Sequence, residues 1–248
     1  MATTRESAAG WTVELDTTPG RRQAQEEFVL HHADGTDERI VLHDYARVYS
    51  VPGLYEEVVQ HRLQCASPAT LATALAEAVA AEGRAVDELR VFDLGAGNGV
   101  VGEELAARGI PVVAGADGVP EARSAAHRDR PGLYAHYLVG ERLDVDAVGA
   151  LVRDEGLTAL AAAGAVGEGH VPKDVLGQLW DTFPPGSFLA LTLADGEADH
   201  DVADVDAVLA ATATTAHPSR VVVRRRFRHR VSMAGTDLHY VVLVAVKD

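Results

Sequence analysis

The sequence has a single cysteine, Cys65, and only two tryptophans and two methionines among its 248 residues. A lone cysteine cannot form a disulfide within the chain, so nothing favours an oxidising compartment. No apolar run reaches the roughly 18 residues that indicate a membrane span, and residues 1–20 lack the apolar segment of a secretory signal. We therefore expect a cytoplasmic protein without membrane contact.

Positive charge is also scarce: 22 lysines and arginines stand against 37 acidic residues, a net charge of −15 at pH 7. A nucleic-acid-binding protein needs a basic face to neutralise phosphates, so we expect no nucleic-acid partner. The densest basic run is RRRFRHR at 224–230, within a strand-like segment. We interpret its charges as protection of a sheet edge against pairing, with an anion site as the alternative.

From residue 89 onward, apolar runs alternate with helical patterns, which is typical of an α/β fold with a doubly wound parallel sheet. The chain then ends on two strand-like runs with no helix between them, which must pair antiparallel. The expected strands are 89–94, 111–116, 134–139, 157–163, 187–193, 220–231 and 238–246, and the expected helices are 100–108, 119–128, 144–154, 172–182 and 201–212.

The part before this alternation has a different character. Residues 1 to about 27 are polar, and we expect a loosely ordered tail there. A hairpin is expected within 28–42, and a helix that Ser67 would cap at its N-terminus. We therefore divide the chain into a tail, hairpin and helical cap, residues 1–84, and an α/β core, residues 85–248.

The most informative segment is VFDLGAGNG at 91–99, an apolar strand followed by an acid and three glycines at alternate positions. Side chains in such a loop would forbid the turn or keep a ligand away from the backbone N–H groups. Gly97, Gly99 and Gly102 also fit a dinucleotide fingerprint, and Asp117 lies where that fingerprint has a ribose-binding acid. The residues alone leave both kinds of nucleotide cofactor open, including NAD.

The string from Asp93 to Gly99 resembles motif I of the class I S-adenosylmethionine (SAM) methyltransferases, an acid followed by G-x-G-x-G. This resemblance implies SAM as the cofactor. It also implies a seven-stranded sheet of order 3-2-1-4-5-7-6 with the last strand antiparallel, preceded by an N-terminal cap. In that family the acid lies near the loop beneath the methionine moiety, and the glycines let that moiety pack on the turn.

The resemblance also assigns residues to the cofactor. Asp117 would accept hydrogen bonds from both ribose hydroxyls, with a helix N-cap as the other interpretation. Glu141, after the third strand, would accept from the adenine amino group, or be an ordinary solvated loop residue. The implied cofactor-binding residues are Asp93, Gly95, Ala96, Gly97, Asn98, Gly99, Asp117, Gly118, Glu141 and Tyr45.

Two segments are candidates for chemistry. Glu168 and His170 follow the fourth strand, where a general base or substrate contact is expected, and histidine has the more suitable pKa. The segment HDYARVYSVPGLYE at 43–56 offers His43, Tyr49 and Tyr55 as substrate residues, with Tyr45 beside the cofactor. The alternative is that the loop residues are merely solvated and that the tyrosines seat the cap on the core.

We therefore expect transfer of the SAM methyl group to an O, N or C nucleophile of a small molecule, with no metal site. The Asn-Pro-Pro-Tyr type of motif is absent after the fourth strand, which disfavours methylation of nucleobases and glutamine amides. A homodimer is possible. The alternative functions are a non-catalytic SAM-binding partner or regulatory protein, and an NAD(P)-linked oxidoreductase.

Overall fold

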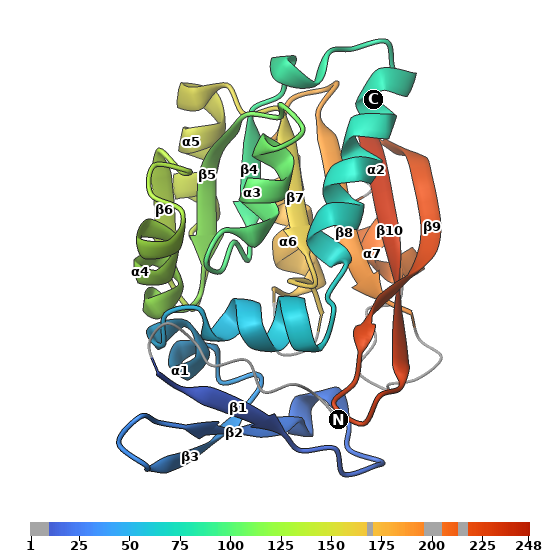
Figure 1. Ribbon diagram of the computed structural model, residues 1–248. Coiled ribbons are helices and arrows are strands. Elements are labelled where there is room, and N and C mark those ends of the chain that lie inside the picture. Colours follow the sequence, from blue (N-terminus) through green and yellow to red (C-terminus); the bar gives the residue numbers. More distant parts are fainter. Residues whose placement is uncertain (1–9, 168–170, 196–204, 213–217) are drawn as a thin grey trace.

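The computed structural model describes residues 10–167, 171–195, 205–212 and 218–248 (Figure 1). Its larger part is a seven-stranded sheet whose neighbouring strands run in the order β6-β5-β4-β7-β8-β10-β9. In chain order the strands are β4 (Val91–Leu94), β5 (Val112–Asp117), β6 (His136–Val139), β7 (Ala159–Ala163), β8 (Phe188–Ala194), β9 (Ser219–Val231) and β10 (Asp237–Lys247).

This topology confirms the predicted fold class, because β4 to β8 follow the expected strand order. The pairs of β4 with β5 and β7, of β5 with β6, and of β7 with β8 are all parallel. β10 is antiparallel to both of its neighbours, β8 and β9. The last strand, β10, thus lies between two strands that both run opposite to it, as the family resemblance implies.

Helices cover both faces of the sheet, which explains why all four residues of β4 are buried. Val91 packs among residues of α2 (Ser67–Ala81) and α3 (Val100–Ala106), whereas Phe92 packs on the opposite face. That opposite face is covered by α5 (Val145–Glu155), α6 (Lys173–Asp181) and α7 (Val205–Thr212). α4 (Pro120–Asp129) lies beside β6 at one side of the sheet (Figure 1). Within the described residues no helix is long and apolar enough to cross a membrane.

A cap precedes the core and lies below the lower ends of the parallel strands in Figure 1. It consists of an antiparallel sheet of order β1-β2-β3, the helix α1 and the π-helix η2. The bounds are β1 (Thr12–Leu15), β2 (Glu27–His31), β3 (Asp37–Val41), α1 (Tyr45–Ser50) and η2 (Glu56–Arg62), with short 3-10 turns η1 (Gln23–Gln25) in the cap and η3 (Val86–Glu88) before β4. The division of the chain at residue 84 stays a prediction. α2, which precedes it, packs on the sheet.

The predicted hairpin is present, with Gly35 at φ +84° in its turn, but the predicted loose tail is wrong for residues 10–27. β1 pairs with β2 along its whole length, and the side chains of Trp11 and Val13 are buried against Phe28. The apolar residues of β1 alternate with polar ones, so one face of this short strand can be buried while the other stays hydrated.

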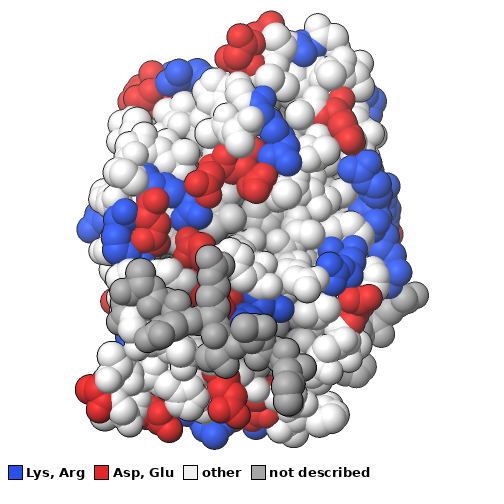
Figure 2. Space-filling model, in the orientation of Figure 1, with Lys and Arg blue, Asp and Glu red and all other residues white. Residues whose placement is uncertain are grey.

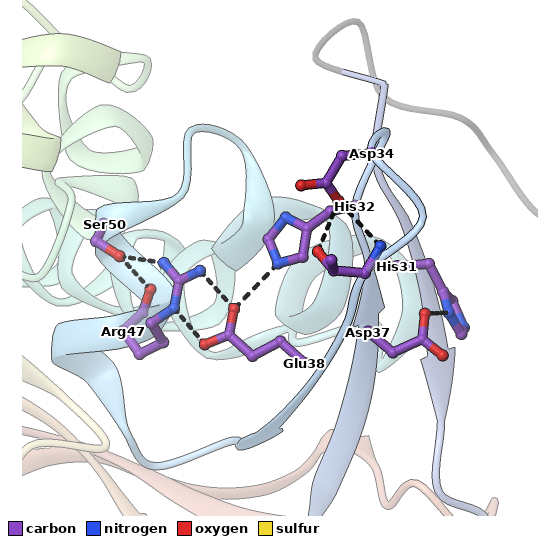
Figure 3. Close-up of polar contacts among 8 residues, drawn as sticks. His31, His32, Asp34, Asp37, Glu38, Arg47 and Ser50 are labelled. Atoms are coloured by element: carbon purple, nitrogen blue, oxygen red, sulfur yellow. Dashed lines mark hydrogen bonds and ion pairs between the residues drawn. The ribbon is translucent and has the colours of Figure 1, made fainter.

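An ion pair fixes α1 to the cap sheet (Figure 3). The Arg47 guanidinium donates to both carboxylate oxygens of Glu38 at 2.7 and 2.6 Å, and His32 lies 3.1 Å from the same carboxylate. The Arg47 hydrogen bonds lower the pKa of Glu38 to about 2. The Asp44 carboxylate accepts from the backbone N–H of Arg47 and so caps α1. These contacts set the position of the helix that carries Tyr45 and Tyr49.

The arginines of β9 are of two kinds. β9 is an edge strand, as predicted, and Figure 2 shows basic side chains along that edge. Its exposed arginines have acidic partners, for example Arg225 with Glu77 on α2. Arg230, in contrast, is buried and pairs at 2.5 Å with Glu26 of the cap. The second carboxylate oxygen of Glu26 accepts from the Met233 backbone N–H. The end of the β9–β10 hairpin is therefore part of the cap's core.

We expect Glu26→Gln to destabilise the protein by about 3 kcal/mol, because Arg230 would remain buried without an opposite charge. The matched change Glu77→Gln breaks an ion pair whose side chains are 50% and 52% exposed, and should cost less than about 1 kcal/mol. Urea unfolding of the two variants measures the difference. Equal losses would show that the Glu26–Arg230 pair does not hold the cap on the hairpin.

Candidate functional site

The glycine loop lies between the end of β4 and the start of α3. Gly95, Gly97 and Gly99 have φ angles of +70°, +54° and +94°, which side chains disfavour. A Cβ atom on Gly97 would lie 2.3 Å from the hydroxyl oxygen of Tyr49. A Cβ atom on Gly95 would lie 2.3 Å from the Cβ atom of Ala165. The loop therefore requires glycine for its backbone shape and for the close approach of its neighbours.

The backbone of Gly97 is held from both sides. Its N–H donates to Oδ2 of Asp117 at 2.9 Å, and its carbonyl accepts from the hydroxyl of Tyr137 at 2.6 Å. Oδ1 of Asp117 accepts from the backbone N–H of Val119, just before α4. Asp117 thus orders both the loop and the start of the next helix. Its predicted contact with ribose hydroxyls stays a prediction.

Asp93 lies beneath the loop and is fully buried. Burial raises the pKa of its carboxyl group to about 7, and the neighbouring charge of Asp117 acts in the same direction. The Tyr134 hydroxyl donates to Oδ2 of Asp93 at 2.7 Å, which opposes that shift in pKa. Asp93 therefore supports the loop from the interior of the sheet.

Asn98 connects the loop to the cap. Its side-chain amide donates to Oε1 of Glu56 at 2.6 Å and to Asp129 at 3.3 Å. Arg130 donates to the same Glu56 oxygen and to the backbone carbonyl of Asn98, both at 3.0 Å. Since Glu56 begins η2, this network closes the cap over the glycine loop.

A cavity of about 100 Å³ lies between the loop and the cap. Tyr45 stacks on Tyr49 with ring centroids 5.8 Å apart, and Tyr49 contacts Tyr55 at 5.2 Å. Burial raises the pKa of all three phenols above its ordinary value, so they stay protonated at neutral pH. The lining contains eight of the predicted residues: His43, Tyr45, Tyr49, Tyr55, Gly95, Ala96, Gly97 and Asn98.

Other predicted residues lie elsewhere. Gly99 faces Arg130 and the residues before β6. Gly118 and Glu141 lie beside each other on the exposed side of Asp117, where a Cβ atom on Gly118 would be 3.9 Å from Cα of Glu141. Glu168 and His170 fall outside the described residues. The predicted cofactor residues therefore lie in two places. Those of the glycine loop line the cavity, whereas Gly118 and Glu141 lie in a more exposed position next to Asp117.

The sequence reasoning missed the far side of the cavity, which Cys65, Ser67, His229, Arg230 and Tyr240 line. Nδ1 of His229 lies 2.7 Å from Oγ of Ser67, and the imidazole stacks on Tyr240 with centroids 3.8 Å apart. Burial, assisted by the charge of Arg230, lowers the pKa of His229 to about 3, so its ring is neutral.

The predicted role of Ser67 as a helix cap is wrong. α2 begins at Ser67 itself, its N-cap is Ala66 without a side-chain bond, and the Ser67 hydroxyl is directed to His229 instead. The partner lies 162 positions away in the chain, so no local pattern could reveal it. In the part of the chain that the structure describes, no group of three or more histidines, cysteines and acids could hold a metal ion.

Solved structures of methyltransferases share this fold. The N-methyltransferase NodS from Bradyrhizobium japonicum WM9, in complex with S-adenosyl-L-homocysteine, aligns with a TM-score of 0.50 at 14% identity, covering 72% of this chain and 85% of that chain. A protein assigned as a sarcosine dimethylglycine methyltransferase, from Galdieria sulphuraria, aligns with the same TM-score and identity over 72% and 84%. No protein-family model and no curated protein sequence matches this chain. The chain therefore has the class I methyltransferase fold.

The raised pKa of Asp93 predicts a pH-dependent stability. In the unfolded chain this carboxyl has its ordinary value of 3.8, whereas in the folded protein it is about 7, so the folded state binds more protons between these values. Its contribution is complete below about pH 4 and is lost as the pH rises to about 7. We expect Asp93→Asn to flatten the fall in unfolding free energy between about pH 4 and pH 7.

Urea unfolding at several pH values measures this effect, with Asp87→Asn on the exposed turn η3 as the matched control. The control should retain the pH slope of the unmodified chain. The same slope in Asp93→Asn would contradict a protonated Asp93 in the folded state.

Proposed function

We propose that the protein is a SAM-dependent methyltransferase that acts on a small molecule. The observation that carries the proposal is the bare backbone at Gly97, in the loop after β4, which Asp117 at the end of β5 orients and which faces an aromatic cavity. The fold adds support, because ligands of open α/β sheets bind beyond the carboxyl ends of the strands. The terminal antiparallel hairpin favours SAM over NAD as the cofactor.

The residues present fit SAM in their chemistry. The glycine loop allows a ligand to approach the main chain, and a carboxylate such as Asp117 can accept from a vicinal diol. Glu141 lies beside Gly118, and the proposal assigns it to the adenine amino group. The phenol rings of Tyr45 and Tyr49 offer aromatic surface to a sulfonium cation. When bound, SAM would supply the electrophilic methyl group.

The cavity of about 100 Å³ is smaller than a ligand site of roughly 300–1,000 Å³. The Tyr49 hydroxyl occupies the space in front of Gly97. Cofactor binding therefore requires Tyr49 to withdraw from the loop, and α1, which carries it, to shift with the cap. The Glu56–Arg130 pair and the hydrogen bond from Arg128 to the backbone carbonyl of Tyr49 join the cap to the core and resist this movement. The Glu38–Arg47 pair keeps α1 on the cap sheet while the cap shifts.

The chain's own residues would act by holding the acceptor in line with the methyl group and by excluding water. The buried phenols are protonated and serve as walls and hydrogen-bond donors rather than bases. The roles of Glu168 and His170 in proton removal stay predictions. A cap enclosing the acceptor side and a net charge of −15 support a small acceptor over a nucleic acid. The homodimer and the cytoplasmic location also stay predictions.

We expect Gly97→Ala to weaken binding of S-adenosylhomocysteine at least tenfold, because the new methyl group would project into the space that ligand and cap share. The matched control is Gly35→Ala, where φ is also positive, +84°, but nothing lies within 4 Å of the new atom. Isothermal calorimetry measures both affinities. NADH binding in place of S-adenosylhomocysteine would refute the cofactor assignment.

Catalysis is tested separately from cofactor binding. Transfer of a labelled methyl group from SAM to members of a panel of small alcohols, phenols and amines would support an enzyme. Tight binding of SAM without transfer to any of them would favour the alternative of a non-catalytic SAM-binding protein.

A further inference from the structure

A β-bulge turns His229 into the cavity. In the register of β9 and β10, Arg230 pairs with Leu238 and Arg228 pairs with His239, so His229 is the additional residue. At the same point two consecutive residues, His229 and Arg230, are both buried. An extra residue re-aims side chains that regular pairing would direct elsewhere. The bulge thus places an imidazole on the wall of the cavity.

The imidazole is held in place by contacts on its ring and on one nitrogen. It stacks on Tyr240, and its Nδ1 lies 2.7 Å from Oγ of Ser67. Oγ1 of Thr192 on β8 donates to the same Ser67 oxygen at 3.3 Å. The backbone carbonyl of His229 accepts from the N–H of Ala66 at 2.7 Å. Among the described residues, Nε2 of His229 makes no hydrogen bond, so this atom is available to a ligand in the cavity.

This end of the cavity is polar but carries no uncompensated charge among the described residues. Burial keeps the His229 ring neutral by lowering its pKa, and raises the pKa of the Cys65 thiol, which therefore stays protonated. The charge of Arg230 is compensated by Glu26 at 2.5 Å. A ligand with an ammonium or carboxylate group would find no opposite charge to pair with here. A neutral ligand with a polar hydrogen fits better.

We propose that this end of the cavity binds the acceptor as a neutral aromatic alcohol, with its hydroxyl at Nε2 of His229 and its ring among the tyrosines. This proposal rests on the proposed methyltransferase function. The cavity of about 100 Å³ is smaller than the cavity of about 150 Å³ that admits benzene, so the ring enters only with the shift of the cap that cofactor binding also requires.

The methyl transfer needs no reactant other than SAM and the aromatic alcohol. The hydroxyl oxygen attacks the sulfonium methyl carbon, the O–C bond forms, and the C–S bond breaks with its electron pair going to sulfur. The hydroxyl proton passes to Nε2 of His229 and then to water as the products leave. Nε2 is an acceptor in the tautomer in which Nδ1–H donates to Ser67, so Ser67 is a positioning residue.

The test uses phenol and toluene, which have nearly the same shape but differ in the hydroxyl group, with benzylamine as a charged probe. The intact chain is saturated with S-adenosylhomocysteine, and histidine ring signals are followed by NMR, with the His229 signal identified by its loss in His229→Gln. We expect phenol to shift the His229 signal and to bind at least threefold more tightly than toluene or benzylamine.

The variants separate this proposal from the proposed function. His229→Gln should remove the preference for phenol over toluene while leaving S-adenosylhomocysteine affinity within twofold. Ser67→Ala should reduce the preference. His239→Gln, the same change on the neighbouring strand outside the cavity lining, should leave it unchanged. Each variant is compared with the unmodified chain by circular dichroism before titration.

Equal affinity for phenol and toluene, or phenol binding that leaves the His229 signal in place, would overturn the assignment of His229 even where S-adenosylhomocysteine binds. If the unmodified chain does not bind S-adenosylhomocysteine, the proposed function fails instead. The phenol and toluene titrations are then run on the ligand-free chain, and the same two results still decide whether His229 binds a neutral hydroxyl.

Discussion

The structure depends on the absence of a side chain at Gly97. Three contacts meet at this residue: Asp117 accepts its N–H, Tyr137 donates to its carbonyl, and the Tyr49 hydroxyl lies where a Cβ atom would be. The first two contacts order the loop within the core, and the third seats the cap on it. Since the same surface is the one a nucleotide-like ligand would approach, cap closure and ligand binding compete for one position. The proposed binding of SAM at this loop would therefore couple the conformation of the cap to occupancy of the loop.

Two buried carboxylates are stabilised in different ways, and the difference follows from their neighbours. Burial favours the protonated form of Asp93 and raises its pKa to about 7, although the Tyr134 hydroxyl that donates to this carboxyl acts in the opposite direction. Glu26 has a guanidinium at 2.5 Å and a backbone N–H at 2.7 Å, which together suit a charged carboxylate. The first group lies in the interior of the sheet, where the Tyr134 hydroxyl and the Gly102 backbone hydrogen-bond to it. The second joins the cap to the far end of the sheet.

The sequence predicted the parts that depend on local pattern. The doubly wound α/β class followed from the alternation of apolar and helical segments, whereas the strand order was implied by the family resemblance that the glycine spacing and the acid before it carry. The tyrosines of 43–56 could be predicted as neighbours of the loop because they form a dense aromatic cluster before the core. β1 was missed, because a strand of four residues gives little periodicity and is stabilised by pairing with β2 rather than by its own sequence.

The residues that escaped prediction are those whose environment is set by long-range pairing. Arg230 resembles its exposed neighbours in sequence, and only its partner Glu26, 204 positions away, distinguishes it. His229 owes its direction to a single extra residue in the pairing of β9 with β10, which composition does not encode. The residues that escaped prediction therefore share one feature, which is a partner far away in the chain.

The two ends of the cavity differ in what lines them. The glycine loop offers its backbone, which a short motif determines, whereas the other end offers side chains from three distant segments. On the proposed assignment of His229 to the acceptor, selection of the acceptor depends on tertiary packing, and substitutions at this end would change the ligand without altering the glycine loop.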